Sequence, residues 1–297
     1  MSFRLSEFAA LAGMEIVRDG DFMVTGKLST PMQGLCVPLR LAKYLDEVNA
    51  NPNVAAVVTT REIAEGVNPR LALAVADKPD EAHSEVHAAC VRQLDSVMRE
   101  RPNSIDPTAI IHPTASFADY AVTIGPHVEI GAMVRIEAGT TVEEGVRLHS
   151  GVVLGVEGFN TGIVGGRLRV MPQLGGVRIK AHAELLAKVC VARALFGGET
   201  TIGEETMIDC HTYIAHDVQI GRRVQICALA NILGRVEIGD EAYIGPSAQI
   251  INGAKVGAKA KVSMGSVVTR DVPDGTRVTG NFALPHDQFV KNLRNLR

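Results

Sequence analysis

Apolar residues recur at every sixth position through the second half of the chain. The series comprises Ile105, Ile111 and Phe117, then Ile124, Ile130, Ile136, Val142, Leu148 and Leu154, then Ile179, Leu185 and Val191, and finally Ile202, Ile208, Ile214, Ile220, Ile226, Ile232, Ile238, Ile244, Ile250, Val256, Val262 and Val268. A period of six matches neither an α-helix nor a single amphipathic strand. It predicts short strands joined by tight turns, with the aliphatic side chains pointing into a narrow prism.

Small residues and glycines accompany the aliphatic positions. A small or β-branched residue follows four positions later, as at Val128, Val146 and Val224, and a glycine often follows immediately, as at Gly125 and Gly203. We expect these glycines to supply turn dihedral angles that other residues resist.

The first 103 residues lack this period and alternate between helical and strand patterns. LSEFAALAG (5–13) predicts a short helix that ends at Gly13, and MEIV and FMVTG predict a hairpin around the turn DGD (19–21). NVAAVVTT (53–60) predicts a buried strand, and residues 79–101 predict an amphipathic helix.

Three regions follow from these patterns. We expect an α/β domain at 1–103, a domain of six-residue repeats at 104–272, and a C-terminal tail with one short helix at 273–297. A glycine-rich segment interrupts the repeat between Leu154 and Ile179. This composition indicates either an excursion near a ligand or subunit boundary, or a surface insertion.

Composition and charge exclude several classes of protein. Aromatic residues make up 4% of the chain, Trp is absent, and there are 29 glycines, which suits repetitive β structure. The net charge of -3 shows no excess of basic residues of the kind that binds nucleic acid. No apolar run has the length of a transmembrane helix, and the five cysteines include no CxxC pair, so we expect reduced thiols and a cytoplasmic protein.

The six-residue period resembles the left-handed parallel β-helix of hexapeptide-repeat acyltransferases, in which three hexads form one coil. The segments IDPTAIIHPTA, GVVLGVEGF, MPQLGGVRI and YIAHDVQIG, placed after a small α/β domain, resemble the UDP-3-O-acylglucosamine N-acyltransferase family of lipid A synthesis. This resemblance implies transfer of a 3-hydroxyacyl chain from acyl carrier protein to the 2-amino group of a UDP-sugar. It also implies that the α/β domain at 1–103 binds the nucleotide sugar, that 104–272 is a left-handed β-helix acyltransferase domain, and that the protein is a homotrimer with active sites between subunits.

The chain departs from the family pattern in three segments. PLRLAKY (38–44) keeps Tyr44 of the uracil-stacking segment but has Pro38 and Leu41 where the family has Phe and Asn. INGAK has Ala254 where the family has a second histidine, and the family's long C-terminal helices shrink to residues 286–297. We therefore expect N-acylation of a nucleotide-linked amino sugar, with either acyl carrier protein or coenzyme A as the donor and no tightly bound cofactor. An acetyl-CoA-dependent N-acetyltransferase of surface-polysaccharide synthesis is the alternative.

His216, within TYIAHDVQIG, is the candidate general base. A neutral imidazole is suited to accept a proton near neutral pH, and the family places its catalytic histidine in the segment that matches YIAHD. Asp217 or Asp209 could orient the ring. One coil of 18 residues places Gly234 against His216, and its N–H is the candidate oxyanion donor.

The remaining candidate residues would bind substrate. We expect Tyr44 to contact the nucleotide base, and Gly158, Phe159 and Asn160 to border the sugar. His211 would be a polar contact near the base.

Two other functions use the same fold. His211 and His216 are five residues apart and His182 lies upstream, a spacing that would suit a three-histidine zinc site of the gamma carbonic anhydrase type. A non-catalytic hexapeptide-repeat subunit is the third interpretation, because the second family histidine is missing. We expect no metal.

Overall fold

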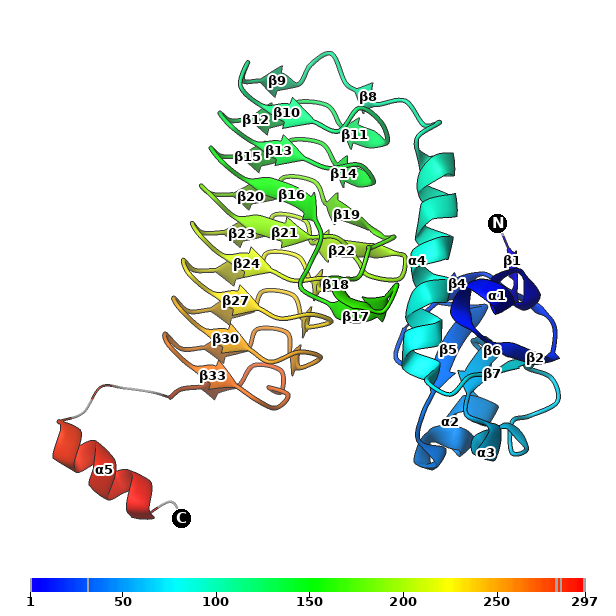
Figure 1. Cartoon of the computed structure of the whole chain (residues 1–297). Coiled ribbons are helices and arrows are strands. Elements are labelled where there is room, and N and C mark those ends of the chain that lie inside the picture. Colours follow the sequence, from blue (N-terminus) through cyan, green and yellow to red (C-terminus); the bar gives the residue numbers. More distant parts are fainter. Residues whose placement is uncertain (1, 31, 281–282, 284, 296–297) are drawn as a thin grey trace.

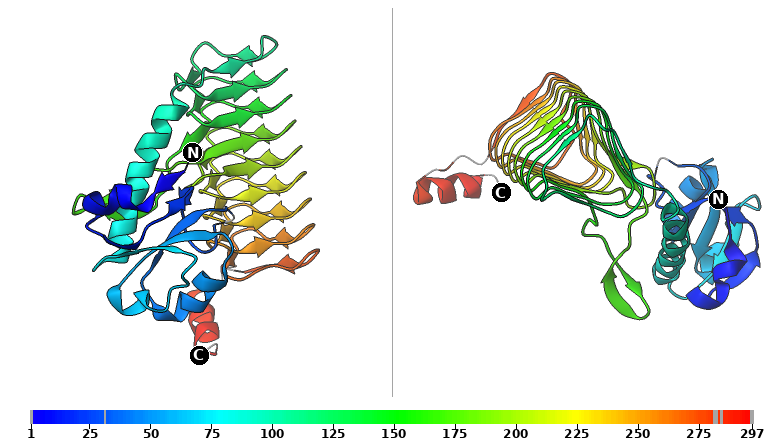
Figure 2. Two further views of the ribbon diagram at one scale, coloured as in Figure 1. Left: turned by 90° about the vertical axis from the view of Figure 1, so that its right-hand side faces the viewer. Right: turned by 90° about the horizontal axis from the view of Figure 1, so that it is seen from above.

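The computed structural model describes residues 2–30, 32–280, 283 and 285–295, and it places a small α/β region beside a long three-sided prism (Figure 1). The prism is a left-handed parallel β-helix, as the sequence predicted, and its triangular section is visible along the axis (Figure 2). Strands one coil apart pair in parallel, so that Ile214 pairs with Ile232.

The prism has three parallel sheets. The first contains β10 (Ser116–Phe117), β13 (Arg135–Ile136), β16 (Val153–Val156), β21 (Cys190–Ala192), β24 (Tyr213–Ile214), β27 (Asn231–Ile232), β30 (Gln249–Ile250) and β33 (Val267–Val268). The second contains β8 (Ser104–Ile105), β11 (Val122–Ile124), β14 (Thr140–Val142), β19 (Gly176–Ile179), β22 (Glu199–Ile202), β25 (Gln219–Ile220), β28 (Glu237–Ile238) and β31 (Lys255–Val256). The third contains β9 (Ile110–Ile111), β12 (Glu129–Ile130), β15 (Arg147–Leu148), β20 (Glu184–Leu185), β23 (Met207–Ile208), β26 (Gln225–Ile226), β29 (Tyr243–Ile244), β32 (Lys261–Val262) and β34 (Arg277–Val278).

The six-residue aliphatic series fills the prism. Val142, Ile214 and Ile250 are fully buried, and burial of one such side chain contributes roughly 1.5–3 kcal/mol. The first coil is the exception: Ile105 is 42% exposed and Phe117 is only partly buried, because no coil covers that end.

The glycines that follow the aliphatic positions have a different role from the one expected. The left-handed turn position is mostly held by other residues, including His211 (φ 59°), Asp217 (φ 61°) and Arg235 (φ 61°). A Cβ on Gly203 would instead lie 2.0 Å from the carbonyl oxygen of Gly221. These glycines are therefore required where successive coils approach closely.

The α/β region is built on a five-stranded sheet in the order β2-β7-β6-β5-β4. Its strands are β2 (Glu15–Arg18), β4 (Val24–Thr25), β5 (Leu35–Leu39), β6 (Val54–Thr59) and β7 (Ala72–Val75), and β1 (Phe3–Arg4) pairs with β3 (Asp21–Phe22) beside it. The helices are η1 (Leu5–Phe8), α1 (Ala9–Ala12), η2 (Ala42–Tyr44), α2 (Leu45–Ala50), α3 (Arg61–Ala64), α4 (Pro79–Met98) and, after the prism, α5 (His286–Asn295).

The hairpin predicted around DGD is wrong. β2 pairs antiparallel with β7, and β4 pairs in parallel with β5. The Asp19 carboxylate accepts hydrogen bonds from Arg4 Nε at 2.7 Å and Ser6 Oγ at 2.9 Å, which hold the N-terminal segment beside this turn. The strands on the two sides of this turn therefore pair with different partners and not with each other.

Two excursions from the prism reach the α/β region. The glycine-rich segment forms an antiparallel hairpin of β17 (Thr161–Val164) and β18 (Arg167–Val170), which projects from the prism toward α4 (Figure 2). A second excursion, not predicted, follows β21 and packs Leu195 and Phe196 among the core residues of the α/β region. Within the part of the chain that the structure describes, no helix is long and apolar enough to span a membrane.

Candidate active site

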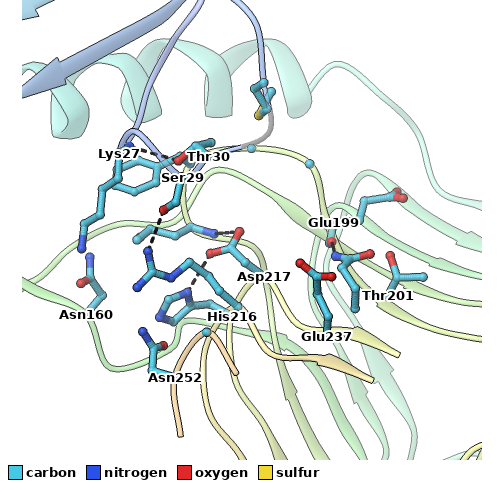
Figure 3. Close-up of a pocket in the computed structure, with 18 of the residues that line it drawn as sticks. Lys27, Ser29, Thr30, Asn160, Glu199, Thr201, His216, Asp217, Glu237 and Asn252 are labelled. Carbon is cyan, nitrogen blue, oxygen red and sulfur yellow. Dashed lines mark hydrogen bonds and ion pairs between the residues drawn. The ribbon is translucent and has the colours of Figure 1, made fainter. Parts of the chain in front are cut away.

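A cavity of about 910 Å³ lies between the α/β region and one corner of the prism (Figure 3). Its lining includes Lys27, Ser29 and Thr30 from the segment after β4, Phe159 and Asn160 from the first excursion, Leu195 and Phe196 from the second, and His216, Asp217, Arg235 and Asn252 from successive coils. Four segments that are separate in the sequence therefore meet here.

His216 and Asp217 form a hydrogen-bonded pair at the turn between β24 and β25. His216 Nδ1 lies 2.7 Å from Asp217 Oδ2, and the His216 side chain is 15% exposed. Asp217 is itself fixed, because its Oδ1 accepts from the Leu195 N–H at 3.2 Å. With Nδ1–H donating to the carboxylate, the ring keeps an unprotonated Nε2, which has no hydrogen-bond partner among the described residues.

Gly234 lies against the imidazole one coil further along. A Cβ at this position would be 2.6 Å from His216 Cε1 and 2.7 Å from Nε2, so a side chain here would displace the ring. No hydrogen bond within the described residues uses the Gly234 N–H. The 18-residue coil therefore brings a residue with an unpaired backbone donor close to the ring.

A buried glutamine holds the first excursion against the same ring. Gln173 is 2% exposed, accepts from the Gly158 N–H at 3.0 Å and donates to the Gly158 carbonyl oxygen at 2.8 Å. Gly158 is consequently fixed beside the ring, where a Cβ would lie 3.4 Å from His216 Cδ2. The sequence prediction omitted Gln173, whose only signal was a glutamine after a proline in the MPQLGG segment.

Three predicted site residues are not brought to the cavity. Tyr44 comes after the C-terminal end of β5, which is the end remote from the segment 27–30. Its side chain is 43% exposed, and Lys43 Nζ lies 4.8 Å from its ring centroid. His211 is exposed at a different corner of the prism, between β23 and β24. Asp209 accepts from the N–H groups of Cys210 and Ala228, so Asp217 alone pairs with His216.

The three histidines of the zinc hypothesis do not converge within one subunit. His182 lies between β19 and β20, His211 between β23 and β24, and His216 between β24 and β25, which are three different corners of the prism. Across the described ranges, no group of three His, Cys, Asp or Glu side chains could hold a metal ion.

Two cations at the cavity were also missed by sequence reasoning. Arg235 Nη1 donates to Ser29 Oγ at 2.9 Å across the boundary between the prism and the α/β region. Burial and the nearby Arg235 guanidinium lower the pKa of the Lys27 ammonium. The two residues are 208 positions apart, and no local pattern connects them.

Comparison with known proteins identifies the repeats. The family model for bacterial transferase hexapeptide (six repeats) matches residues 199–234, and the model for the hexapeptide repeat of succinyl-transferase matches 121–155 and 235–270. These matches confirm the hexapeptide-repeat prediction.

Similarity to individual proteins covers part of the chain. It is 42% identical over 139 residues to UDP-3-O-acylglucosamine N-acyltransferase of Caulobacter vibrioides, and 43% identical over 144 residues to the protein of that name from Myxococcus xanthus. Each match covers 47% of this chain and 41% of the relative, so the chain spans less than half the length of these relatives.

Among solved structures, UDP-N-acetylglucosamine acyltransferase from Campylobacter jejuni is 22% identical with a TM-score of 0.49, covering 65% of this chain and 83% of that chain. Residues 121–155 and 199–270 thus match hexapeptide-repeat families, and about half of the chain is similar in sequence to UDP-3-O-acylglucosamine N-acyltransferases.

Proposed function

We propose that this protein is an N-acyltransferase, which moves an acyl group from a thioester to the amino group of a nucleotide-linked amino sugar. The observation that carries this proposal is the His216–Asp217 pair, whose free Nε2 lies at a cavity shared by the prism and the α/β region. A hydrogen bond from the other ring nitrogen to a carboxylate is how proteins fix the tautomer of a catalytic imidazole.

The chemistry follows from the two free groups. His216 Nε2 accepts the proton of the amine as the nitrogen attacks the thioester carbonyl carbon, and Asp217 stabilises the imidazolium that forms. The N–H of Gly234 stabilises the negative charge on the carbonyl oxygen. The tetrahedral intermediate then breaks its carbon–sulfur bond, the thiolate takes the proton from His216, and an amide and a free thiol remain. A positioned base of this kind contributes roughly 10²–10⁴ in rate.

The cavity suits a substrate that extends from the α/β region to His216. Its volume of about 910 Å³ lies within the range of small-molecule sites, and Phe159 and Asn160 lie on its wall, where we place the sugar. The nucleotide then lies toward the segment 27–30. Acyl carrier protein or coenzyme A supplies the thioester.

A panel of donors and acceptors tests the reaction. Purified protein is supplied with 3-hydroxyacyl carrier protein or acetyl-CoA and with UDP- or GDP-linked amino sugars, and mass spectrometry measures amide formation beside thiol release. We expect one amide for each thiol with an amino-sugar acceptor, and none when the amine is replaced by a hydroxyl. Thiol release that no amine acceptor increases would contradict the proposal.

A further inference from the structure

The cavity holds two cations that have no carboxylate partner. Among the residues that the structure describes, neither Lys27 Nζ nor the Arg235 guanidinium has an acidic oxygen within ion-pair distance. Lys27 is exposed at the wall of the cavity, and Arg235 Nε is buried without a hydrogen-bond acceptor among the described residues. Cations without a carboxylate partner at a cavity wall are available to bind an anionic ligand.

Two of the three acids of the same cavity are ion-paired. Glu199 pairs with Arg178 Nε at 2.6 Å and Glu237 with Lys255 Nζ at 3.0 Å, whereas Asp217 is hydrogen-bonded to the neutral His216 ring and keeps its negative charge. Lys27 and Arg235, the two cations without an ion pair, therefore outnumber the single unneutralised carboxylate of Asp217 in this cavity, although the whole chain is acidic with a net charge of -3.

The two cations are held in place by separate elements. Lys27 and Thr30 form a tight turn, in which the Lys27 N–H donates to Thr30 Oγ1 at 3.0 Å and the Thr30 N–H donates to the Lys27 carbonyl at 2.9 Å. Arg235 occupies the left-handed turn position beside Gly234, and Ser29 accepts its Nη1 (Figure 3). The Lys27 side chain extends toward Asn160 in the same view, across the space between the two regions.

We propose that Lys27 and Arg235 form a diphosphate clamp, which binds the diphosphate of the nucleotide sugar where the α/β region meets the prism. This inference rests on the proposed function for the identity of its ligand. A guanidinium with free N–H donors and a lysine opposite it are the groups that bind phosphate oxygens most strongly. The position next to Gly234 leaves the sugar amine within reach of His216.

The clamp implies recognition of phosphates in preference to the base. Tyr44, the expected base-stacking residue, lies outside the cavity. Binding should therefore depend on the diphosphate and vary little between UDP and GDP, while UMP and uridine should bind much more weakly. Affinity should also fall as salt is added, because charge supplies much of the attraction.

Calorimetric titration with UDP, GDP, UMP and uridine tests the clamp. We expect Lys27→Met and Arg235→Gly each to weaken UDP binding by roughly tenfold or more, since each removes a charged hydrogen-bond donor. Glycine accepts the left-handed conformation at this turn, so Arg235→Gly keeps the backbone.

Two matched controls remove cations without touching the clamp. Arg223→Gly changes an arginine at the same turn position on another corner of the prism, and Lys255→Met removes a cation of the cavity that already pairs with Glu237. Both should change UDP affinity by less than about twofold. Equal losses in the controls and the clamp variants, or equal affinity for UDP and uridine, would overturn the proposal.

Two further experiments test the diphosphate clamp independently of the proposed reaction. His216→Ala should lose acyl transfer and keep UDP affinity, so a failed acyltransferase with clamp-dependent UDP binding would overturn the reaction alone. Coenzyme A also carries a diphosphate. Loss of coenzyme A binding in the clamp variants, with UDP binding unchanged, would assign the clamp to the donor and overturn the proposed ligand.

Discussion

At the scale of single residues, the site depends on a position where a side chain is missing. Gly234 has a backbone conformation that alanine can adopt, but its absent Cβ is the space that the His216 ring occupies. The nearest atoms to such a Cβ belong to the side chains of His216 and Asn252, which can move, and not to backbone.

Gly234→Ala should therefore impair activity much more than stability. The added methyl group would push the imidazole away from its contact with Asp217, and we expect acyl transfer to fall by roughly 10²-fold, the contribution of a positioned base. The melting temperature should change little. Steady-state kinetics and thermal unfolding of the variant measure the two effects.

Gly203→Ala is the matched control for this prediction. Its Cβ would lie 2.0 Å from a carbonyl oxygen and 2.3 Å from the carbonyl carbon of Gly221, and this backbone cannot move aside without disturbing the coil. We expect a loss of about 1–3 kcal/mol in the free energy of unfolding, as for other overpacked positions. A Gly234→Ala enzyme with normal kcat would show that the ring needs no such space.

The residue-scale predictions succeeded where the six-residue repeat determines the distance between two residues. His216 and Gly234 lie one coil apart, so their proximity could be predicted from the 18-residue spacing. Lys27 and Arg235 meet only because the α/β region packs against the prism, which no periodicity describes. That Tyr44 lies away from this cavity could not be predicted for the same reason, since its position depends on the direction of β5.

At the scale of elements, α4 connects the α/β region to the excursion that borders the site. His87 on α4 has its Nε2 2.7 Å from the Pro172 carbonyl oxygen and its Nδ1 2.6 Å from Thr25 Oγ1. Nε2–H therefore donates to the carbonyl and Nδ1 accepts the hydroxyl proton, which requires a neutral ring. Pro172 precedes Gln173, so this contact supports the segment that fixes Gly158.

Stability should depend on pH through the histidines of α4. Burial lowers the pKa of His83 to about 3 and of His87 to about 4, below the value of about 6.5 expected in the unfolded chain. As pH falls below about 6.5, the unfolded chain takes up protons that the native state does not. Each histidine should then cost about 1.4 kcal/mol per pH unit, or roughly 2 kcal/mol between pH 6.5 and 5.

Denaturant unfolding at several pH values between 5 and 7 measures this loss. His87→Gln should reduce the pH slope by about half, because one of the two protonation sites is removed. His127→Gln removes an exposed histidine of the prism and should leave the slope unchanged. Stability that stays constant from pH 7 to 5 would contradict the burial of these rings as neutral groups.

Whole elements could be predicted where burial alone decides them. The prism followed from the aliphatic series, because short strands joined by tight turns at a six-residue period point their aliphatic side chains to one interior. The buried strand β6 and the helix α4 were predicted for the same reason. The hairpin at DGD and the second excursion were not, because strand partners and the docking of Leu195 and Phe196 depend on contacts between distant segments.

At the scale of the whole molecule, the site has exposed apolar neighbours. Leu233 and Ile251 immediately precede the turns of Gly234 and Asn252, and they are 39% and 43% exposed. We propose that a second copy of the chain covers them in a homotrimer, which would place each site between two subunits and enclose the cavity further.

Light scattering should give three times the mass of the chain at micromolar concentration. Ile251→Glu should reduce this mass and acyl transfer together, since it places a charge in the proposed interface, whereas Lys259→Glu on the surface should change neither. A wild-type protein that scatters as a monomer would contradict the trimer.

The central claim is that His216 is the general base of an acyl transfer. The most direct measurement is the rate of amide formation by His216→Ala and His211→Ala, with melting temperature recorded for each. We predict that His216→Ala loses roughly 10²-fold or more in kcat while its melting temperature stays close to that of the wild type. His211→Ala, which changes an exposed histidine on another corner, should keep nearly full activity. A His216→Ala protein that acylates at the wild-type rate would contradict the account.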